Sequence, residues 1–219
     1  MARSRFKTVL IFGVPGVGKG TQGRVLGSIP GMFHCASGDI FRSLDPDSTE
    51  AREVESFTSR GNLAPDDLTV RVWRQWLDAQ IASGRFNPGE ELLLLDGIPR
   101  NLHQCEMLEE HVKVMRVIYL AASTDDPMVA RIKQRALVED RADDTDVEII
   151  RRRFQVYREQ SAPVLNYYPT ELTTAINPMG SVAEVLHRIL TCLIPVQNEF
   201  VISRGLFGQP ENPRDPESE

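Results

Sequence analysis

The chain has 219 residues, of which 41% are hydrophobic, and a formal net charge of −6. This length and apolar content suit one full-sized domain with a sizeable core, and the acidic balance argues against a protein that binds nucleic acid mainly through phosphate contacts. Three widely separated cysteines without C-x-x-C spacing indicate reduced thiols of a cytoplasmic protein, and no cysteine zinc site. We expect no membrane span and no signal peptide, because the apolar runs are too short.

The first element is a short apolar run at residues 7–12, which predicts a strand buried on both faces. A glycine-rich turn follows, and a helix is predicted from about residue 21 to 28. Strand, glycine-rich turn, lysine, hydroxyl and helix is the layout of a phosphate-binding loop. Its backbone N–H groups and the helix N-terminus would face an anion. The turn residues are Gly13, Pro15, Gly16, Val17, Gly18, Lys19, Gly20 and Thr21.

Two side chains in this loop have the chemistry of a nucleotide site. Lys19 offers a point charge for the β- and γ-phosphates, and Thr21 offers a hydroxyl for Mg²⁺. The spacing departs from the strict G-x-x-x-x-G-K-[ST] pattern by one position, because Gly20 stands before Thr21. An ordinary glycine-rich turn between a strand and a helix is the alternative.

Downstream, continuous apolar strands alternate with helical segments, which predicts an α/β fold with a parallel sheet covered on both faces. Further strands are predicted at residues 33–36, 92–95, 114–120 and 172–176, and further helices at 48–60, 66–82, 99–111, 125–139, 147–165 and 181–193.

The composition changes after Pro195. Residues 208–219 are rich in proline and acids, which is typical of disorder. Residues 200–207 are more apolar, and the sequence leaves open whether they pack on the body. We therefore assign 195–219 to a partly disordered tail.

The second motif is LLLLDGIPR at residues 92–100. Asp96 ends a buried strand, where an acid can hold the water ligands of Mg²⁺. Arg100 can bind a phosphate with two parallel hydrogen bonds. Alternatively, Asp96 caps the next helix and Arg100 is a solvated surface residue.

The third motif is a set of arginines around a short acidic segment. A solvated helix face with ion pairs is the usual meaning of such a run. However, Arg131 and Arg135 are four residues apart and share a face, and arginines that converge on one site suit a transferring phosphoryl group. The set comprises Arg131, Arg135, Arg141, Arg151, Arg152 and Arg153, with Asp143 and Asp144 between them.

Taken in order, these motifs resemble those of the nucleoside monophosphate kinases, and short-lid adenylate kinases most closely. In that family the loop has Gly before its Thr. The resemblance covers about residues 7–193 and implies a three-layer P-loop NTPase fold with a five-stranded parallel sheet. It implies one domain at 1–194, with an acceptor-binding insert near 37–66 and a short lid near 132–145. The motifs are GVPGVGKGTQ at 13–22, SGDIFR at 37–42, GNLAPDDL at 61–68, LDGIPRNLHQ at 95–104, and RIKQR…RADD…RRRF…Y at 131–157.

The resemblance implies the reaction ATP + AMP ⇌ 2 ADP with Mg²⁺, in a cytoplasmic monomer whose partners are ATP and AMP. A UMP/CMP kinase and an ATP-binding regulatory protein with weak turnover are the alternatives. By position, the implied catalytic residues are Lys19, Arg100, Arg135, Arg141 and Arg153. The implied ATP site contains the loop residues above, from Gly13 to Thr21, with Arg131. The implied AMP site contains Ser37, Gly38, Arg42, Gly97, Arg100 and Gln104, and Thr21 and Asp96 are implied to support Mg²⁺ through water.

Gln104 stands where adenylate kinases place a glutamine that reads the AMP base, whereas UMP/CMP kinases carry Asn there. A solvent-facing helix residue is the alternative for Gln104. Counting residues along the chain leaves two candidates, Arg152 and Arg153, for the last arginine of the site. We prefer Arg153, because the helix that follows determines how this segment aligns with the family pattern. The chain departs from the family pattern at Ile98, where an aromatic is usual, and at Ala136, where a glycine is usual.

Overall fold

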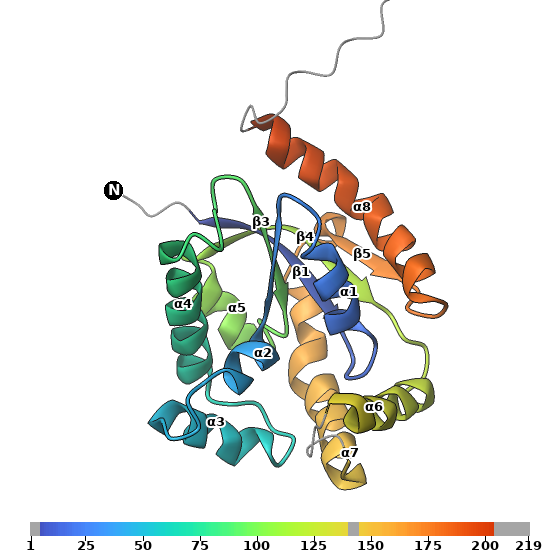
Figure 1. Ribbon diagram of the computed structural model, residues 1–219. Coiled ribbons are helices and arrows are strands. Elements are labelled where there is room, and N and C mark those ends of the chain that lie inside the picture. The colour runs from blue at the N-terminus through green and yellow to red at the C-terminus, as the bar shows by residue number, and fades with distance from the viewer. Residues whose placement is uncertain (1–4, 140–144, 204–219) are drawn as a thin grey trace, which may run out of the picture.

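The computed structural model describes residues 5–139 and 145–203 (Figure 1). A five-stranded sheet lies at its centre in the order β2-β3-β1-β4-β5, and every neighbouring pair is parallel. The predicted α/β fold with a five-stranded parallel sheet is therefore confirmed. The strands are β1 Phe6–Gly13, β2 Met32–Ala36, β3 Leu92–Asp96, β4 Val112–Leu120 and β5 Thr173–Ile176.

Helices cover both faces of the sheet, which explains why its central strands are continuously apolar. Leu92 to Leu95 of β3 are at most 1% exposed, as are Val9 to Ile11 of β1. Helices α1 and α8 contact each other on one face, and α4 and α5 pack together on the other (Figure 1). The helices are α1 Lys19–Leu26, α2 Ser37–Arg42, α3 Thr49–Thr58, α4 Asp66–Ala82, α5 Leu102–Leu108, α6 Asp126–Glu139, α7 Val147–Val156 and α8 Val182–Ser203.

Two predicted helices are shorter than the sequence suggested. The helix expected from Pro99 begins only at Leu102, because the Asn101 side chain accepts a hydrogen bond from the Gln104 N–H and caps α5. The helix expected over 147–165 is regular only to Val156. A π-helical turn and a 3₁₀ segment follow, and Pro163, which lacks an N–H donor, lies in the latter.

The last helix is longer than predicted. We expected it to end at Leu193, but α8 continues through Pro195 to Ser203. Its apolar face also continues, since Val196 and Phe200 are buried, and Gln197 Nε2 donates to the Pro30 carbonyl at 2.8 Å. The predicted boundary at residue 194 therefore falls inside a packed helix, and residues 204–219 lie outside the described part of the chain.

Helix α8 is the one described helix with the length and apolar content of a possible membrane span, which by itself is weak evidence for one. Its 22 residues have a mean hydropathy of 1.2 in the most apolar window, enough to cross a membrane by length and composition alone. In the structure, however, this helix packs against β4, β5 and α1, and its polar residues include Glu184 and Arg188. The buried apolar residues of this helix therefore cover part of the sheet.

Candidate active site

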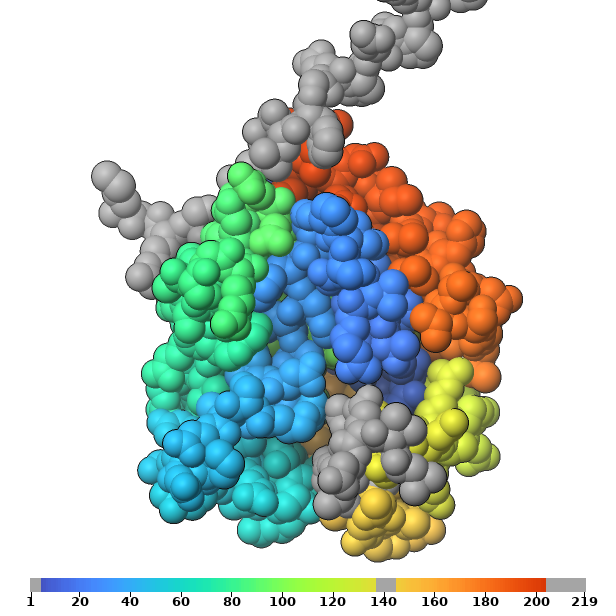
Figure 2. Space-filling view, viewed as in Figure 1, coloured from blue at the N-terminus to red at the C-terminus, as the bar shows by residue number. Residues whose placement is uncertain are grey.

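A cavity of about 1160 Å³ opens at the carboxyl edge of the sheet. Its walls come from the turn between β1 and α1, from helices α2 and α3, from residues 96–104, and from α6 and α7. A hollow between α1 and the α2–α3 segment is visible in Figure 2. Parallel α/β sheets bind ligands at this edge, so the cavity is the candidate active site. The segment between β5 and α8, together with the first turn of α8, adds a wall that sequence reasoning missed. It is formed by Pro178, Gly180 and Ser181 of the segment and by Val182 and Val185 of α8.

The predicted phosphate-binding loop joins β1 to α1. Gly13 and Gly16 have φ angles of 148° and 78°, in the left-handed region that favours glycine. A Cβ at these positions would lie 2.7 Å from the Leu120 carbonyl oxygen and 2.6 Å from that of Met128. The loop is therefore packed against β4 and α6, and only glycine fits at these two positions.

Lys19 begins α1 and its side chain folds back over the loop. Its Nζ donates to the carbonyl oxygens of Gly13 at 2.7 Å and Val14 at 3.1 Å. Burial is the main cause that lowers the pKa of this ammonium. Asp96 opposes the shift and Arg100 and Arg135 add to it, so that the net pKa is about 8. A cation held among other cations in this way is well placed to bind an anion.

Asp96, at the end of β3, is 8% exposed and faces the start of α1. A Cβ on Gly20 would lie 3.7 Å from its Oδ2. Burial alone would raise the pKa of Asp96, but His34 and Lys19 favour the charged form and the pKa is lowered overall. His34 Nε2 lies 3.9 Å from Oδ2, a distance that allows an ion pair rather than a hydrogen bond.

The Asp96 carboxylate and the Thr21 hydroxyl, both in the cavity lining, are hard oxygen donors of the kind that Mg²⁺ prefers. No group of three or more His, Cys, Asp or Glu suited to a metal occurs in the described residues. This set fits Mg²⁺ that keeps several waters and is bound mainly through substrate phosphates, since that ion is seldom enclosed by protein ligands alone.

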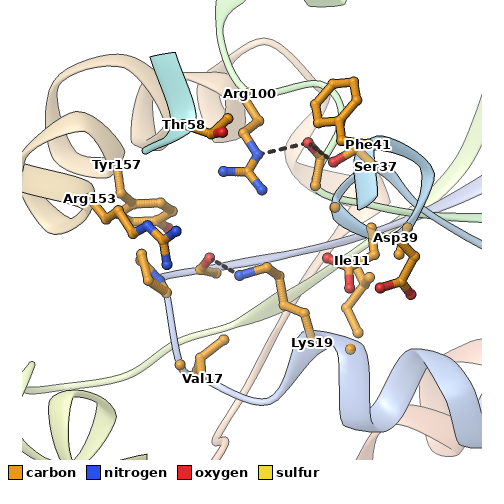
Figure 3. Close-up of a pocket in the computed structure, with 18 of the residues that line it drawn as sticks. Ile11, Val17, Lys19, Ser37, Asp39, Phe41, Thr58, Arg100, Arg153 and Tyr157 are labelled. Carbon is orange, nitrogen blue, oxygen red and sulfur yellow. Dashed lines mark hydrogen bonds between the residues drawn. The ribbon is translucent and has the colours of Figure 1, made fainter. Parts of the chain in front are cut away.

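The other end of the cavity is built around Gly97. Its carbonyl oxygen accepts from Ser37 Oγ at 2.9 Å and from Arg100 Nε at 2.8 Å (Figure 3). A Cβ on Gly97 would lie 2.5 Å from Ser37 Oγ, so this close approach needs glycine. Arg42 pairs with Asp39, and its Nη1 would lie 3.1 Å from a Cβ on Gly38.

Arginines from separate elements converge on the cavity. Figure 3 shows the guanidinium groups of Arg100 and Arg153 pointing into the space that Lys19 also faces. Burial by the cavity walls lowers the pKa of Arg100; Arg153 and Arg42 lower it further, whereas Asp96 opposes the shift. Mutual repulsion among these cations would be relieved by a bound polyanion.

Helices α6 and α7 supply further basic groups. Arg131, Arg135 and Arg153 line the cavity, and Arg131 Nη1 makes a long contact of 3.5 Å to the Val17 carbonyl oxygen. Arg152 is outside the cavity lining, and its Nε donates to Asn62 Oδ1 at 2.8 Å. The structure therefore places Arg153 in the cavity and Arg152 beside the α3–α4 loop. Arg141 lies outside the described residues.

Gln104 is only 1% exposed and lines the cavity, so the alternative of a solvent-facing residue is wrong. Both ends of its amide are bonded within the protein, to Asp66 and to the Arg100 N–H. Sequence reasoning missed Asp66. It lies in the quoted GNLAPDDL motif, but the sequence carries no signal that pairs it with a side chain 38 positions away.

A phosphate-binding loop after one strand, an acid at the end of its neighbour and converging arginines define a P-loop phosphotransferase. Comparison with known proteins specifies the family. Residues 11–173 match the family model described as "Adenylate kinase". The chain is 37% identical over 191 residues to an adenylate kinase of Kocuria rhizophila, with 84% of this chain and 97% of the relative covered.

Two further relatives support the same assignment. The chain is 36% identical over 192 residues to an adenylate kinase of Thermobifida fusca, with 84% of this chain and 97% of the relative covered. It is 38% identical over 192 residues to one of Clavibacter michiganensis subsp. michiganensis, with 84% and 92% covered. The chain belongs to the adenylate kinase family.

Proposed function

We propose that the protein transfers the γ-phosphoryl group of Mg-ATP to AMP and so forms two molecules of ADP. The observation that carries this proposal is one cavity in which Lys19, Arg100 and Arg153 face a common space. Phosphoryl transfer needs little covalent chemistry from the protein, and its rate depends mainly on positioning and on stabilising charge at the phosphoryl oxygens. Membership of the adenylate kinase family supports the choice of reaction.

In this proposal the donor nucleotide occupies the β1–α1 side of the cavity. The loop residues from Gly13 to Thr21 hold its phosphates through backbone N–H groups and the helix N-terminus. Lys19 exchanges its carbonyl partners for phosphate oxygens, and Arg131 lies against the donor base. Thr21 and Asp96 would hold Mg²⁺ through its waters. The ion would supply positive charge that offsets the charge developing on the phosphates.

The acceptor occupies the side lined by Ser37, Gly38, Arg42 and Gly97. Arg42 and Arg100 bind its phosphate, and Gln104 contacts its base. Arg100, Arg135 and Arg153 then surround the transferring phosphoryl group with positive charge. Arg141, which lies outside the described residues, keeps its expected role in stabilising the same group. No side-chain base is required, because the attacking oxygen belongs to a phosphate that is already an anion.

Two alternatives are less well supported. A UMP/CMP kinase would use the same fold and arginines, but the amide at Gln104 matches the amine and ring nitrogen of adenine. A regulatory protein with weak turnover is disfavoured because Lys19, Arg100, Arg135 and Arg153 all line the described cavity. The cytoplasmic and monomeric states stay predictions.

The test is turnover with Mg-ATP and, in separate reactions, AMP, dAMP, CMP, UMP and GMP, with ADP as the product measured. We expect efficient turnover with AMP and much less with the others. A preference for CMP or UMP would overturn the acceptor assignment. Binding of ATP without turnover of any acceptor would favour the regulatory alternative. In the same assay Arg100→Ala should lower kcat about 100-fold or more and raise the KM for AMP, and near-normal kinetics would remove Arg100 from the site.

A further inference from the structure

Asp66, at the start of α4, holds the side chains of two residues near the acceptor side of the cavity. Its Oδ1 accepts from Gln104 Nε2 at 2.7 Å and from Asn101 Nδ2 at 2.8 Å. At the opposite end of the same amide, Gln104 Oε1 accepts from the Arg100 backbone N–H at 2.8 Å. Gln104 is therefore held between a carboxylate and a backbone donor.

These two neighbours fix which way the Gln104 amide faces. An ionised carboxylate only accepts hydrogen bonds, and a backbone N–H only donates them. If the amide were rotated by half a turn, its oxygen would face the Asp66 carboxylate and its NH₂ would face the Arg100 N–H. Both hydrogen bonds would then be replaced by repulsive contacts. Asp66 and Arg100 therefore both favour the same orientation of the Gln104 amide, and the rotated orientation satisfies neither of them.

The fixed amide has one donor and one acceptor site left for a ligand. Nε2 has a second N–H, and Oε1 has a second lone pair. Gln104 lines the cavity together with Ser37, Arg42 and Arg100. A base that binds there meets a donor and an acceptor in an order that Asp66 determines.

That order distinguishes purines by the substituent at C6. Adenine offers an accepting N1 beside a donating 6-amino group, which matches the remaining N–H and lone pair of Gln104. A 6-oxo purine such as hypoxanthine has the reverse pattern, with a donating N1–H beside an accepting oxygen. It would match the amide only after the half-turn that Asp66 opposes.

We propose that Asp66 is a positioning residue that selects 6-amino over 6-oxo purine nucleotides at the acceptor site, by fixing the orientation of the Gln104 amide. This inference rests on the proposed function, because it deepens the recognition of the acceptor. The hydrogen bond from Gln104 to Asp66 involves a charged acceptor, and the free energy of such bonds corresponds to about 10- to 100-fold in relative binding.

The test compares kcat/KM for AMP and for IMP, with Mg-ATP as donor, in the wild type and two variants. Asp66→Asn keeps the shape but lets the residue donate or accept, and Asp66→Ser is too short to reach Gln104. We expect the ratio of kcat/KM for AMP to that for IMP to fall about tenfold in both variants, with the KM for ATP unchanged. Asp67→Asn is the matched control, since Asp67 is the neighbouring exposed acid of the same helix, and it should keep the wild-type ratio.

A double variant separates positioning from a merely structural role. If Asp66 acts through the amide, then in a Gln104→Met background the further change Asp66→Asn should leave the AMP to IMP ratio unaltered. An unchanged ratio in the single Asp66 variants, in a wild type that does phosphorylate AMP, overturns this inference alone. A ratio of kcat/KM for AMP to that for IMP that still falls when Asp66→Asn is added to Gln104→Met would also overturn this inference. Failure of the wild type to phosphorylate AMP instead overturns the proposed function.

Discussion

The basic side chains at the sheet edge and those on helices α6 and α7 line the same cavity but are held in different ways. At the sheet edge, Lys19 and Arg100 bond to backbone carbonyls within six residues of themselves. On the helices, Arg131 reaches the Val17 carbonyl, 114 positions away. Arg152, which lies outside the cavity lining but precedes Arg153 on α7, reaches Asn62, 90 positions away. The first region is therefore organised by local sequence, whereas the second depends on how distant elements pack.

The basic side chains at the sheet edge are therefore preorganised by local structure, whereas those on α6 and α7 are positioned by their helices. A shift of α6 or α7 relative to the sheet would move Arg131 and Arg153 but leave Lys19 and Arg100 in place. The Arg152–Asn62 hydrogen bond joins α7 to the α3–α4 loop, and a Cβ on Gly61 would lie 2.9 Å from the Ile149 carbonyl oxygen. We therefore expect this contact to limit such a shift.

The largest effect should follow from a change at the sheet edge. Lys19→Met keeps the length of the side chain but removes its charge, so phosphate binding and transition-state stabilisation are both lost. We expect kcat/KM for ATP to fall about 1000-fold, at the upper end of what one preorganised donor contributes. Steady-state kinetics measure this, and thermal unfolding checks that the fold is kept. A loss below tenfold would show that the loop amides alone hold the phosphates.

On α7, substitutions of two neighbouring arginines should have very different effects on kcat. Arg153→Ala removes a charge that faces the cavity, and we expect kcat to fall about 100-fold. Arg152→Ala removes one hydrogen bond to a neutral amide, which is worth only about 1 kcal/mol, so we expect a change of a few-fold. Both variants remove the same charge and chemistry from one helix, so each is the control for the other. Equal losses would contradict the assignment of Arg153 to the site.

Over one pH unit, the pH dependence that comes from Lys19 should be a smaller effect than the loss of either Arg153 or Lys19. Its pKa in the folded protein is lowered to about 8, so the free enzyme loses the ammonium above that pH. We expect kcat/KM for ATP to fall about tenfold per pH unit above about pH 8, since this parameter reports groups of the free enzyme. Lys19→Arg should remove this descending limb from the remaining activity, because a guanidinium stays charged. If the fall in kcat/KM above about pH 8 persists in Lys19→Arg, it arises from another group.

Stability should respond to the same group in the opposite direction. The pKa of Lys19 is lower in the folded state than in the unfolded chain, where it is about 10.4. Between about pH 8 and 10.4 the unfolded state therefore binds more protons at this residue, and the contribution of Lys19 to the free energy of unfolding rises with pH. Denaturant titrations of the wild type and Lys19→Met across this range would show whether alkaline loss of activity is separate from unfolding.

Several expectations from the sequence failed for identifiable physical reasons. The run 147–165 has a helical composition, but Tyr157 to Asn166 adopt π and 3₁₀ geometry. The last helix was expected to end at Leu193, yet the burial of Val196 and Phe200 stabilises the turns beyond that residue. In both cases packing outweighed local preference.

The sequence by itself determined the elements whose signals are local. Continuous apolar runs specified the buried strands, and the glycine-rich run that contains Gly13 and Gly16 specified the turn between β1 and α1. In the structure both glycines have left-handed φ angles. The side chains of Lys19, Asp96 and Arg100 follow from this, because each lies within a few residues of a strand end.

Only the tertiary structure decided which side chains from distant segments meet. It placed Arg153 in the cavity and Arg152 against Asn62, and it brought Asp66 to the amide of Gln104. Such pairs depend on how α4 packs against α5, and on where α7 lies relative to the α3–α4 loop. Burial of apolar surface sets that packing, and no local pattern of residues encodes which polar partners it brings together.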